Sequence, residues 1–359
     1  MRTEKVNSTA KGLSSPAPNW SQRRTSMLGK QLLLICIALN VSVLAFGQDS
    51  KLIDAAKKEG GKVVIYGSFE PDTLNLITTA LQRRTGLQTE YWRAQDSQVM
   101  DRALGEYRTG KPLFDIILAT DNPMRIMSRE GILARYDSPS AKDFPKDALD
   151  PELGPRYRNF ITGVIYNKEV LKADIPKTFD DLLKPQFRGK LVMADPTQHA
   201  ATIQWLSSLD KLLGKDADKF IRDLGASKPV LVQNSLIAAE RVSTGETPIA
   251  ISQIKFIFTF GKKGAPLDYV RFGKFLGDGA YAGISAKALH PSAARAFLDF
   301  FLDEESMNIM AKEGEFVSRR GIYPPIPDAD KMQFVNMVDL DAKGYTEKKK
   351  EFQKYFMKR

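Results

Sequence analysis

The feature that most constrains this chain is the regular alternation of short apolar runs and helix-like segments over residues 62–131. Strands are expected at residues 62–66, 87–92 and 114–119, and each is followed by apolar residues at helical spacing. A glycine closes each of these helical segments, as is typical of helix C-termini. Strands that alternate with helices at this spacing form a parallel sheet with helices on both faces. The sequence therefore predicts an α/β fold.

A similar pattern returns in the second half of the chain. One long helix is expected at residues 292–312, and a shorter one at residues 202–213. Further strands are expected at residues 160–166, 190–194, 230–232, 248–251, 267–272 and 280–285. At 359 residues the chain is also long for a single hydrophobic core. Two α/β units in one chain predict two lobes with a cleft between them.

An export signal is predicted near the N-terminus. Lys30 precedes an apolar run at residues 32–46, which ends in Ala45-Phe46-Gly47. The run is 15 residues long, shorter than the roughly 20 residues that span a bilayer. A basic residue, an apolar run and a small-x-small ending are typical of a cleaved signal peptide. We therefore expect a signal peptide at residues 1–47 and a periplasmic mature protein, with either Met1 or Met27 as the start.

Charge and cysteine content narrow the functional classes. The formal net charge is +10, but residues 1–47 hold six bases and one acid, so the rest of the chain is only mildly basic. This balance does not favour a nucleic-acid partner. The only cysteine, Cys36, lies inside the apolar run. The predicted mature protein therefore has no disulfide and no thiolate ligand for a metal.

Candidate ligand-binding residues follow from a rule for open α/β sheets, in which ligands bind outside the carboxyl ends of the strands. The polar and aromatic residues near the expected cleft are Ser68, Phe69, Glu70, Arg93, Gln95, Ser97, Thr120, Asp121, Thr162, Thr197, Gln198, His199, Gln233, Asn234, Gln253 and Lys255. For any single residue among them, a helix cap or a turn is the competing interpretation. The hypothesis depends on the convergence of several such loops.

The sequence contains no set of residues that is typical of catalysis. Its two histidines, His199 and His290, have no partners at metal-ligand spacing. No phosphate-binding loop, G-x-S-x-G elbow or H-E-x-x-H motif is present. We therefore predict neither an enzyme nor a resident metal or cofactor. The basic C-terminal segment is expected to be a helix that packs Phe352, Tyr355 and Phe356 against the body of the protein.

Several segments in a characteristic order carry a family resemblance. They are residues 63–68 with Arg84-Thr85-Gly86, residues 114–119 with 130–133, residues 162–167 with 176–183 and 187–190, and residues 293–305. On these segments the chain resembles family 1 extracellular solute-binding proteins of ABC importers, in the branch that includes the periplasmic ferric-ion-binding proteins.

This resemblance implies a type II periplasmic-binding fold, with hinge closure on a small ligand and delivery to an inner-membrane permease and its ATPase. Each lobe would then hold a mixed, mainly parallel sheet flanked by helices, and the protein would be a monomer. The expected lobes are residues 48–156 with 272–325, and residues 157–271. A helical extension would follow at residues 326–359.

One departure from the ferric-binding members bears on the ligand. Those members carry adjacent tyrosines after the strand that here ends at Ile251, whereas this chain has Ile254-Lys255. Lys255 and Arg93 suggest a site for a small anionic organic or phosphorus-containing solute. A ferric receptor with atypical ligands, a ligand-presenting sensory module and a solvated, outward-facing Lys255 remain alternatives. On the anion-site hypothesis, Lys255→Glu should abolish binding and leave the melting temperature of the empty protein nearly unchanged.

Overall fold

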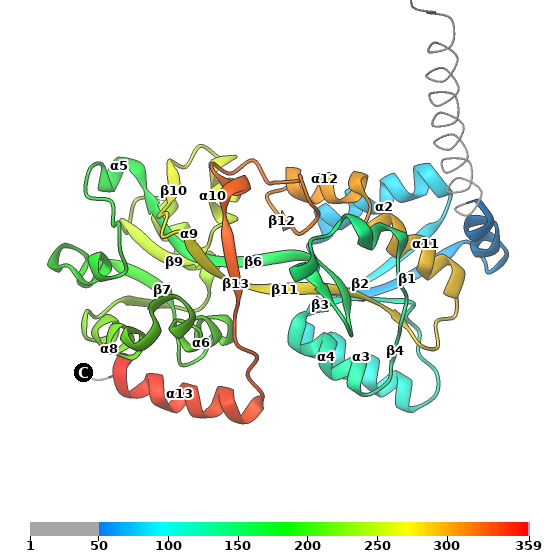
Figure 1. The fold of residues 1–359 in the computed structure, drawn as a ribbon, viewed down its shortest axis with the longest axis horizontal. Coiled ribbons are helices and arrows are strands. Elements are labelled where there is room, and N and C mark those ends of the chain that lie inside the picture. The colour runs from blue at the N-terminus through cyan, green and yellow to red at the C-terminus, as the bar shows by residue number, and fades with distance from the viewer. Residues whose placement is uncertain (1–49, 358–359) are drawn as a thin grey trace, which may run out of the picture. The chain divides into compact units, whose positions relative to one another are not determined.

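The computed structural model describes residues 50–357 (Figure 1). The predicted signal peptide and its cleavage site lie outside the described residues. Leu52–Arg359 form one compact unit. Within the described part of the chain, no helix has both the length and the apolar character needed to cross a membrane.

The first part of the unit has the alternation of strands and helices that the sequence predicts. Its elements are β1 (Lys62–Gly67), α2 (Pro71–Thr85), β2 (Gln88–Arg93), α3 (Asp96–Arg108), β3 (Ile116–Thr120) and α4 (Asp121–Arg129). Strand β1 pairs in parallel with both β2 and β3. Pro71 opens α2, where its missing N–H costs nothing, and Gly86 ends that helix with a φ of 78°. Local sequence signals therefore predict the boundaries of these elements to within a few residues.

The remaining elements complete the α/β architecture. The strands are β4 (Leu133–Ala134), β5 (Leu149–Asp150), β6 (Gly154–Asn167), β7 (Leu191–Ala194), β8 (Val230–Val232), β9 (Ile249–Gln253), β10 (Leu267–Tyr269), β11 (Lys274–Ser285), β12 (Phe316–Val317) and β13 (Gln333–Asn336). The helices are α5 (Lys168–Leu171), α6 (Ala200–Ser207), α7 (Asp210–Leu213), α8 (Ala217–Ala226), α9 (Ser235–Ser243), α10 (Phe256–Gly261), α11 (Pro291–Phe301), α12 (Glu304–Lys312) and α13 (Ala342–Phe356). Short 3-10 turns lie at Pro139–Asp143, Lys146–Ala148, Asp180–Leu183, Pro185–Phe187, Gly214–Asp216 and Ala329–Lys331.

Two long antiparallel strands, β6 and β11, connect the two halves of the sheet. The strand order along the main path is β2-β1-β3-β11-β6-β9-β7-β8. In Figure 1, β6 and β11 run side by side through the middle of the unit, with helices on either side. Both strands are longer than the segments expected at residues 160–166 and 280–285. The α/β fold class is confirmed, and the two predicted sheets are continuous through β6 and β11.

The hydrophobic side chains form four clusters that fall into two groups. Two clusters draw on residues 56–157 and 280–322, and the other two on residues 161–276 and 316–352. In both groups the buried strand residues pack against the apolar faces of the flanking helices, which is where most of the hydrophobic stabilisation arises. This division parallels the two predicted lobes, whose boundaries remain a prediction.

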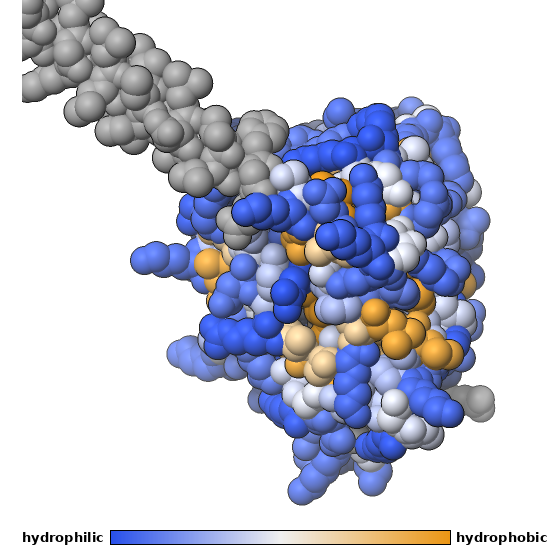
Figure 2. Space-filling view, turned by 90° about the vertical axis from the view of Figure 1, so that its right-hand side faces the viewer, coloured by the Kyte–Doolittle hydropathy of each residue, from blue (hydrophilic) through white to orange (hydrophobic). Residues whose placement is uncertain are grey.

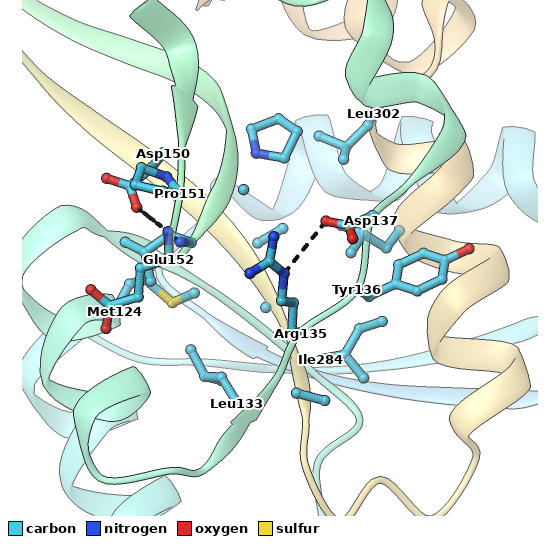
Figure 3. A pocket seen from close by; sticks show the side chains of 17 residues that line it. Met124, Leu133, Arg135, Tyr136, Asp137, Asp150, Pro151, Glu152, Ile284 and Leu302 are labelled. Carbon is cyan, nitrogen blue, oxygen red and sulfur yellow. Dashed lines mark hydrogen bonds and ion pairs between the residues drawn. The ribbon is translucent and has the colours of Figure 1, made fainter.

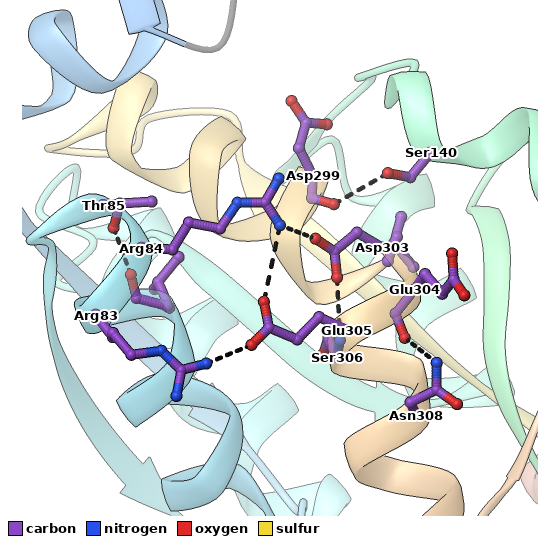
Figure 4. Close-up of polar contacts among 12 residues, drawn as sticks. Arg83, Arg84, Thr85, Ser140, Asp299, Asp303, Glu304, Glu305, Ser306 and Asn308 are labelled. Carbon is purple, nitrogen blue, oxygen red and sulfur yellow. Dashed lines mark hydrogen bonds and ion pairs between the residues drawn. The ribbon is translucent and has the colours of Figure 1, made fainter. Parts of the chain in front are cut away.

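The prediction of one long helix at residues 292–312 is wrong, because the helix is interrupted between α11 and α12. Asp303 has an extended backbone, and its carboxylate accepts a hydrogen bond from the N–H of Ser306 at 3.0 Å. The same carboxylate forms an ion pair with Arg84 of α2, as Figure 4 shows. Asp303 is therefore an N-cap that starts a second helix.

The helix expected at residues 202–213 is divided in a similar way. Helix α6 ends at Ser207, and the short helix α7 begins at Asp210. The hydroxyl of Ser208 donates to the backbone oxygen of Gln204 and accepts from the N–H of Val338 in the C-terminal segment. A side chain that bonds to the backbone in this way competes with the regular helical pattern.

The C-terminal segment crosses the sheet and then packs outside it. Strand β13 pairs in parallel with β11, and α13 lies beside α6 and α8 (Figure 1). Phe352 is fully buried, and Tyr355 and Phe356 pack against the same cluster, which confirms the expected docking of this helix. A Cβ at Gly225 would lie 2.6 Å from the backbone oxygen of Tyr355. The close approach of α13 therefore requires glycine at this position of α8.

The surface is largely hydrophilic. Figure 2 shows the face at one end of the unit, where polar side chains predominate and apolar ones gather in small patches. The large apolar side chains that are exposed include Leu76 and Leu289. Apolar groups of this size are common on the surface of a soluble domain.

Candidate ligand-binding site

Glu70 lies at the start of α2, directly after the loop that follows β1. It occupies the N-cap position, but its side chain makes no capping hydrogen bond. One carboxylate oxygen, Oε2, instead accepts from Nη1 of Arg158 at 2.7 Å. The other, Oε1, accepts from Nζ of Lys255 at 3.0 Å. The carboxylate of Glu70 therefore links the β1–α2 loop to two cations on other elements.

Lys255 comes from the opposite group of elements. It follows β9 and stands at the N-cap of α10, while Ile254 before it is fully buried. The ammonium donates to Oε1 of Glu315 at 2.7 Å as well as to Glu70. The side chain is only 15% exposed. The alternative of a solvated, outward-facing Lys255 is therefore wrong for this structure, because the ammonium is held between two carboxylates.

Arg158 lies on β6 beneath this group and is almost completely buried. Its guanidinium stands over the rings of Phe69 and Phe160, at 4.2 and 4.6 Å from their centroids. Nη1 also lies 3.1 Å from Oε1 of Glu315. The two aromatic faces favour a cation between them and fix the plane of the guanidinium. The guanidinium of Arg158 is thus held in a fixed position, where it contacts both carboxylates.

The four charged side chains Glu70, Arg158, Lys255 and Glu315 form what we call the ionic cluster. Two positive and two negative charges balance within it. Burial opposes ionisation of Glu70, but Arg158 and Lys255 outweigh this and lower the pKa of its carboxyl to about 2. Buried charges are tolerated only when they are paired in this way. Glu70 is therefore ionised at neutral pH, and the cluster is costly to break by removing one member.

The N-terminal side of the ionic cluster holds three further residues. Phe69 is buried, and its backbone oxygen accepts from the hydroxyl of Tyr91 at 2.8 Å. Burial raises the pKa of Tyr91, while the nearby Arg93 and Arg158 oppose the rise. Arg93 ends β2 and its side chain is exposed. A third basic side chain, besides Arg158 and Lys255, thus lies at the edge of this region.

Several predicted residues form contacts within their own loops. Asn234 caps α9 by accepting from the N–H of Ile237, and His199 caps α6 by accepting from the N–H of Thr202. Gln95 forms a reciprocal capping pair with Gln98 at the start of α3. The competing interpretation of these three residues as caps is therefore correct for the structure. A direct role in ligand binding remains a prediction for them.

The loop after β7 is held by its own hydrogen bonds. Asp195 accepts from the N–H and the hydroxyl of Thr197 and from the side-chain amide of Gln198. Thr197 is buried and Gln198 is exposed. These hydrogen bonds fix the conformation of the loop and hold the exposed side chain of Gln198 in one position.

The other predicted residues are spread around the sheet. Thr162 and Gln253 are partners in the pairing of β6 with β9. The N–H of Ser68 donates to the backbone oxygen of Leu118. Ser97 and Gln233 are exposed. Of the sixteen candidates, the structure brings Phe69, Glu70 and Lys255 together around Arg158, and it does not gather the rest into that cluster.

The structure also reveals functional candidates that the sequence did not. Arg158 and Glu315 complete the ionic cluster but lie outside every loop expected to line the cleft. Across the described residues, no hydrogen-bond partner reaches the buried Nε of Arg158 or Oε2 of Glu315. Arg158 precedes the apolar run at residues 160–166, and Arg156 stands two positions before it, so no pattern in the sequence singled out Arg158 as a buried cation.

A group of acidic side chains lies near the same strands. Asp278 of β11 has Asp121, Asp96 and Asp339 nearby. Asp96 accepts from the hydroxyl of Thr120, and Asp121 forms an ion pair with Arg125. Burial, and then these like charges, raise the pKa of Asp278 to about 7. The carboxyl of Asp278 is therefore half-protonated near neutral pH.

Asp278→Asn should stabilise the protein at pH 8 and have little effect at pH 4. Because the folded-state pKa of Asp278 lies above its ordinary value of 3.8, the folded protein loses stability as pH rises from about 4 through 7. Asparagine removes that penalty, which we expect to be about 1–3 kcal/mol at pH 8. Urea unfolding at both pH values measures it, with the exposed Asp137→Asn as control. Equal stability of Asp278→Asn and wild type at pH 8 would contradict the assignment.

A separate small cavity lies beside β4 and β11 (Figure 3). Its volume is about 100 Å³, and it is lined by Met124, Leu133, Ile284 and Leu302 among others. Asp150 at its edge accepts from the N–H of Glu152 at 2.8 Å. Such a volume holds about three water molecules and is small compared with ordinary ligand pockets. This cavity is therefore too small to be the predicted cleft.

Within residues 50–357, no group of three or more histidine, cysteine, aspartate or glutamate side chains is placed to hold a metal ion. At the position where the ferric-binding members carry tyrosines, this chain presents the ammonium of Lys255, which cannot ligate a metal while it is protonated.

Comparison with known proteins relates the chain to one family of bacterial binding proteins. Residues 77–339 match the family model of bacterial extracellular solute-binding proteins. An uncharacterized protein of Haemophilus influenzae is 21% identical over 336 residues, which covers 88% of this chain and 94% of that protein. A probable ABC transporter periplasmic-binding protein of Sinorhizobium fredii is 26% identical over 147 residues, 40% of each chain.

Two solved structures have the same fold. The periplasmic binding protein AfuA of Actinobacillus pleuropneumoniae, solved with fructose 6-phosphate bound, has a TM-score of 0.65 and 20% identity, and the match covers 83% of this chain and 99% of AfuA. Iron-bound HitA of Pseudomonas aeruginosa has a TM-score of 0.67 and 19% identity, and the match covers 81% of this chain and 99% of HitA. These likenesses confirm the type II periplasmic-binding fold.

The match to the family model spans most of the chain and fixes its class. Proteins of this family are substrate-binding transport proteins rather than enzymes. They bind small ligands outside the cytoplasm and work with the permease of an ABC transporter. The chain therefore belongs to the bacterial extracellular solute-binding proteins, the periplasmic binding components of ABC transporters.

Proposed function

We propose that the chain captures a small anionic solute at Lys255 and Arg158 and delivers it, chemically unchanged, to an ABC permease powered by its ATPase. The observation that carries this proposal is the pair of cations joined by Glu70 and Glu315 between the β1–α2 loop and the β9–α10 loop. Charge-assisted hydrogen bonds from arginine and lysine suit carboxylate and phosphate groups. The fructose 6-phosphate in AfuA supports an organophosphate as one such solute.

The competing ligand is ferric iron, which HitA binds in the same fold. An ammonium repels a metal ion, whereas it attracts a phosphate or a carboxylate. The replacement of the expected tyrosine pair by Ile254-Lys255 therefore favours the anion. In this proposal Arg93, Gln198 and Gln233 contact the rest of the solute, because these side chains are exposed.

Calorimetric titration of protein freed of bound solute tests this function. Fructose 6-phosphate and inorganic phosphate should release or absorb heat on binding, with an affinity that falls as salt is added. Ferric citrate should produce no visible tyrosinate-to-iron absorption band. An absorption band with ferric citrate, together with no heat from either phosphate compound, would overturn the anion proposal and support the ferric one.

We further propose that residues 1–47 are a signal peptide and that the mature protein is a monomer. The apolar run at residues 32–46 and the small residues before Gln48 support cleavage after Gly47. N-terminal sequencing of the exported protein should begin at Gln48, and sedimentation should give the mass of a single chain. A membrane-bound form that keeps residues 1–47 would contradict the cleavage, and a dimer mass would contradict the monomer.

A further inference from the structure

The two carboxylates of the ionic cluster differ in how deeply they are held. The side chain of Glu315 is 3% exposed, whereas that of Glu70 is 42% exposed. A single oxygen of Glu315 contacts both cations. Glu70 uses one oxygen for each cation and covers them from the solvent side. Glu315 is therefore the permanent partner of the cation pair, and Glu70 is the partner that can leave.

We infer that Glu70 is a displaceable internal counter-ion, which occupies the cation pair in the ligand-free protein and is replaced by an anionic group of the solute. This inference rests on the proposed function and adds a specificity-determining residue to it. The carboxylate of Glu70 already has the shape and charge of the ligand group that would replace it. Its two contacts, at 2.7 and 3.0 Å, mark where two oxygen atoms of a carboxylate or phosphate would bind.

The fold offers Glu70 a second resting place. Glu70 stands at the N-cap of α2, and no side-chain cap is present there. Pro71 has no N–H, but the residues after it present amide groups that a capping side chain can bind. A helix N-terminus also favours a negative charge. When a solute displaces Glu70 from the cations, its carboxylate can therefore turn to the start of its own helix instead of remaining unpaired.

The charge balance indicates which solutes can make this exchange. Without Glu70, the positive charges of Arg158 and Lys255 outnumber the negative charge of Glu315 by one. A group with a single negative charge restores neutrality, as a carboxylate or a singly ionised phosphate does. An uncharged sugar cannot replace the carboxylate, because it would leave a buried positive charge without compensation. Glu70 would thus exclude neutral solutes from this site.

The exchange also agrees with the ionisation of Glu70. Arg158 and Lys255 hold the pKa of its carboxyl to about 2 against the effect of burial. The counter-ion is therefore charged throughout the neutral range, and it competes with an anionic solute at every pH at which the transporter works.

Glu70→Gln tests the inference. The amide keeps the size of the side chain but removes the competing charge. In calorimetric titrations at low salt, inorganic phosphate and fructose 6-phosphate should bind to Glu70→Gln at least about tenfold more tightly than to wild type. Glu70→Ala should change affinity in the same direction. Asp72→Asn is the matched control, because Asp72 is an exposed acid in the first turn of the same helix, and we expect it to change affinity by about twofold or less.

The outcomes separate this inference from the proposed function. If Lys255→Met weakens binding while Glu70→Gln equals Asp72→Asn or binds more weakly than wild type, the anion site stands and the counter-ion role is wrong. A loss of binding in Glu70→Gln would instead make Glu70 a direct ligand contact. If neither phosphate compound binds to Glu70→Gln, the inference is overturned, because this variant exposes the cation pair to any anion. If Lys255→Met binds as well as wild type, the proposed function itself fails.

Discussion

Replacing Lys255 with methionine should weaken the binding of fructose 6-phosphate or phosphate by about a hundredfold or more. Methionine keeps an apolar stem at the start of α10 but removes one of the two cations that would hold the anion. Truncating one partner of a buried charge pair typically costs about 2–5 kcal/mol of binding free energy. Calorimetry measures the loss, and Lys262→Met is the control because Lys262 is exposed at the other end of the same helix.

The structure also changes the expected behaviour of Lys255→Glu. We predicted from the sequence that this variant would leave the melting temperature of the empty protein nearly unchanged. Because Lys255 contacts both Glu70 and Glu315, a glutamate here would place three carboxylates together. We now expect a lower melting temperature for Lys255→Glu than for Lys255→Met. Equal melting temperatures for the two variants would mean that the ion pairs do not form in solution.

Replacing Arg158 with methionine should destabilise the empty protein by about 3–5 kcal/mol. The guanidinium is almost fully buried, and its removal leaves Glu315 buried with Lys255 as its one remaining charged partner in the ionic cluster. The contacts of the guanidinium with Phe69 and Phe160 are lost as well. Urea unfolding of the empty protein measures the change in the free energy of unfolding.

A double variant distinguishes a buried unpaired charge from a simple loss of packing. Arg158→Met combined with Glu315→Gln should recover a large part of the lost stability, since no uncompensated carboxylate remains. Arg129→Met, at an exposed position of α4, should change the free energy of unfolding by less than about 0.5 kcal/mol. A loss of less than about 1 kcal/mol in Arg158→Met, or no recovery in the double variant, would contradict the structural role of Arg158.

The elements with strong local signals were predictable from the sequence. The strand expected at residues 87–92 is β2 (Gln88–Arg93), and the strand expected at residues 62–66 is β1 (Lys62–Gly67). These segments combine a continuous apolar run or helical spacing with a glycine or proline at the boundary. Local chemistry and tertiary packing agree in such segments, so their boundaries differ from the prediction by only one or two residues.

The boundaries of β6 and β11, which connect the two halves of the sheet, were harder to predict. Gly277-Asp278-Gly279 in the middle of β11 has the composition of a turn, and Pro155, Arg156 and Arg158 interrupt the apolar pattern of β6. Tertiary pairing overrides these local preferences, because β6 and β11 hydrogen-bond to each other along this stretch. Strand propensity alone therefore cannot reveal the full length of either strand.

The site was predictable only in part. The strand-end rule found Glu70 and Lys255, since they lie in the loops that follow β1 and β9. It did not find Glu315, which lies in none of the loops expected to line the cleft. Glu315 forms its ion pair with Lys255 although the two residues are 60 positions apart in the sequence. Long-range ion pairs of this kind leave no pattern in a single sequence. The rule also selected caps such as Asn234, because caps and ligand contacts draw on the same polar residue types at the same positions.

The most direct test of the central claim is to identify the solute that the protein carries when it is purified from the periplasm. Native mass spectrometry gives the mass of the complex, and the solute released on unfolding can be analysed in negative-ion mode. We predict an organic solute with a carboxylate or phosphate group, retained by wild type and absent from Lys255→Met. Bound iron, or an uncharged solute retained equally by both proteins, would contradict an anion site at Lys255 and Arg158.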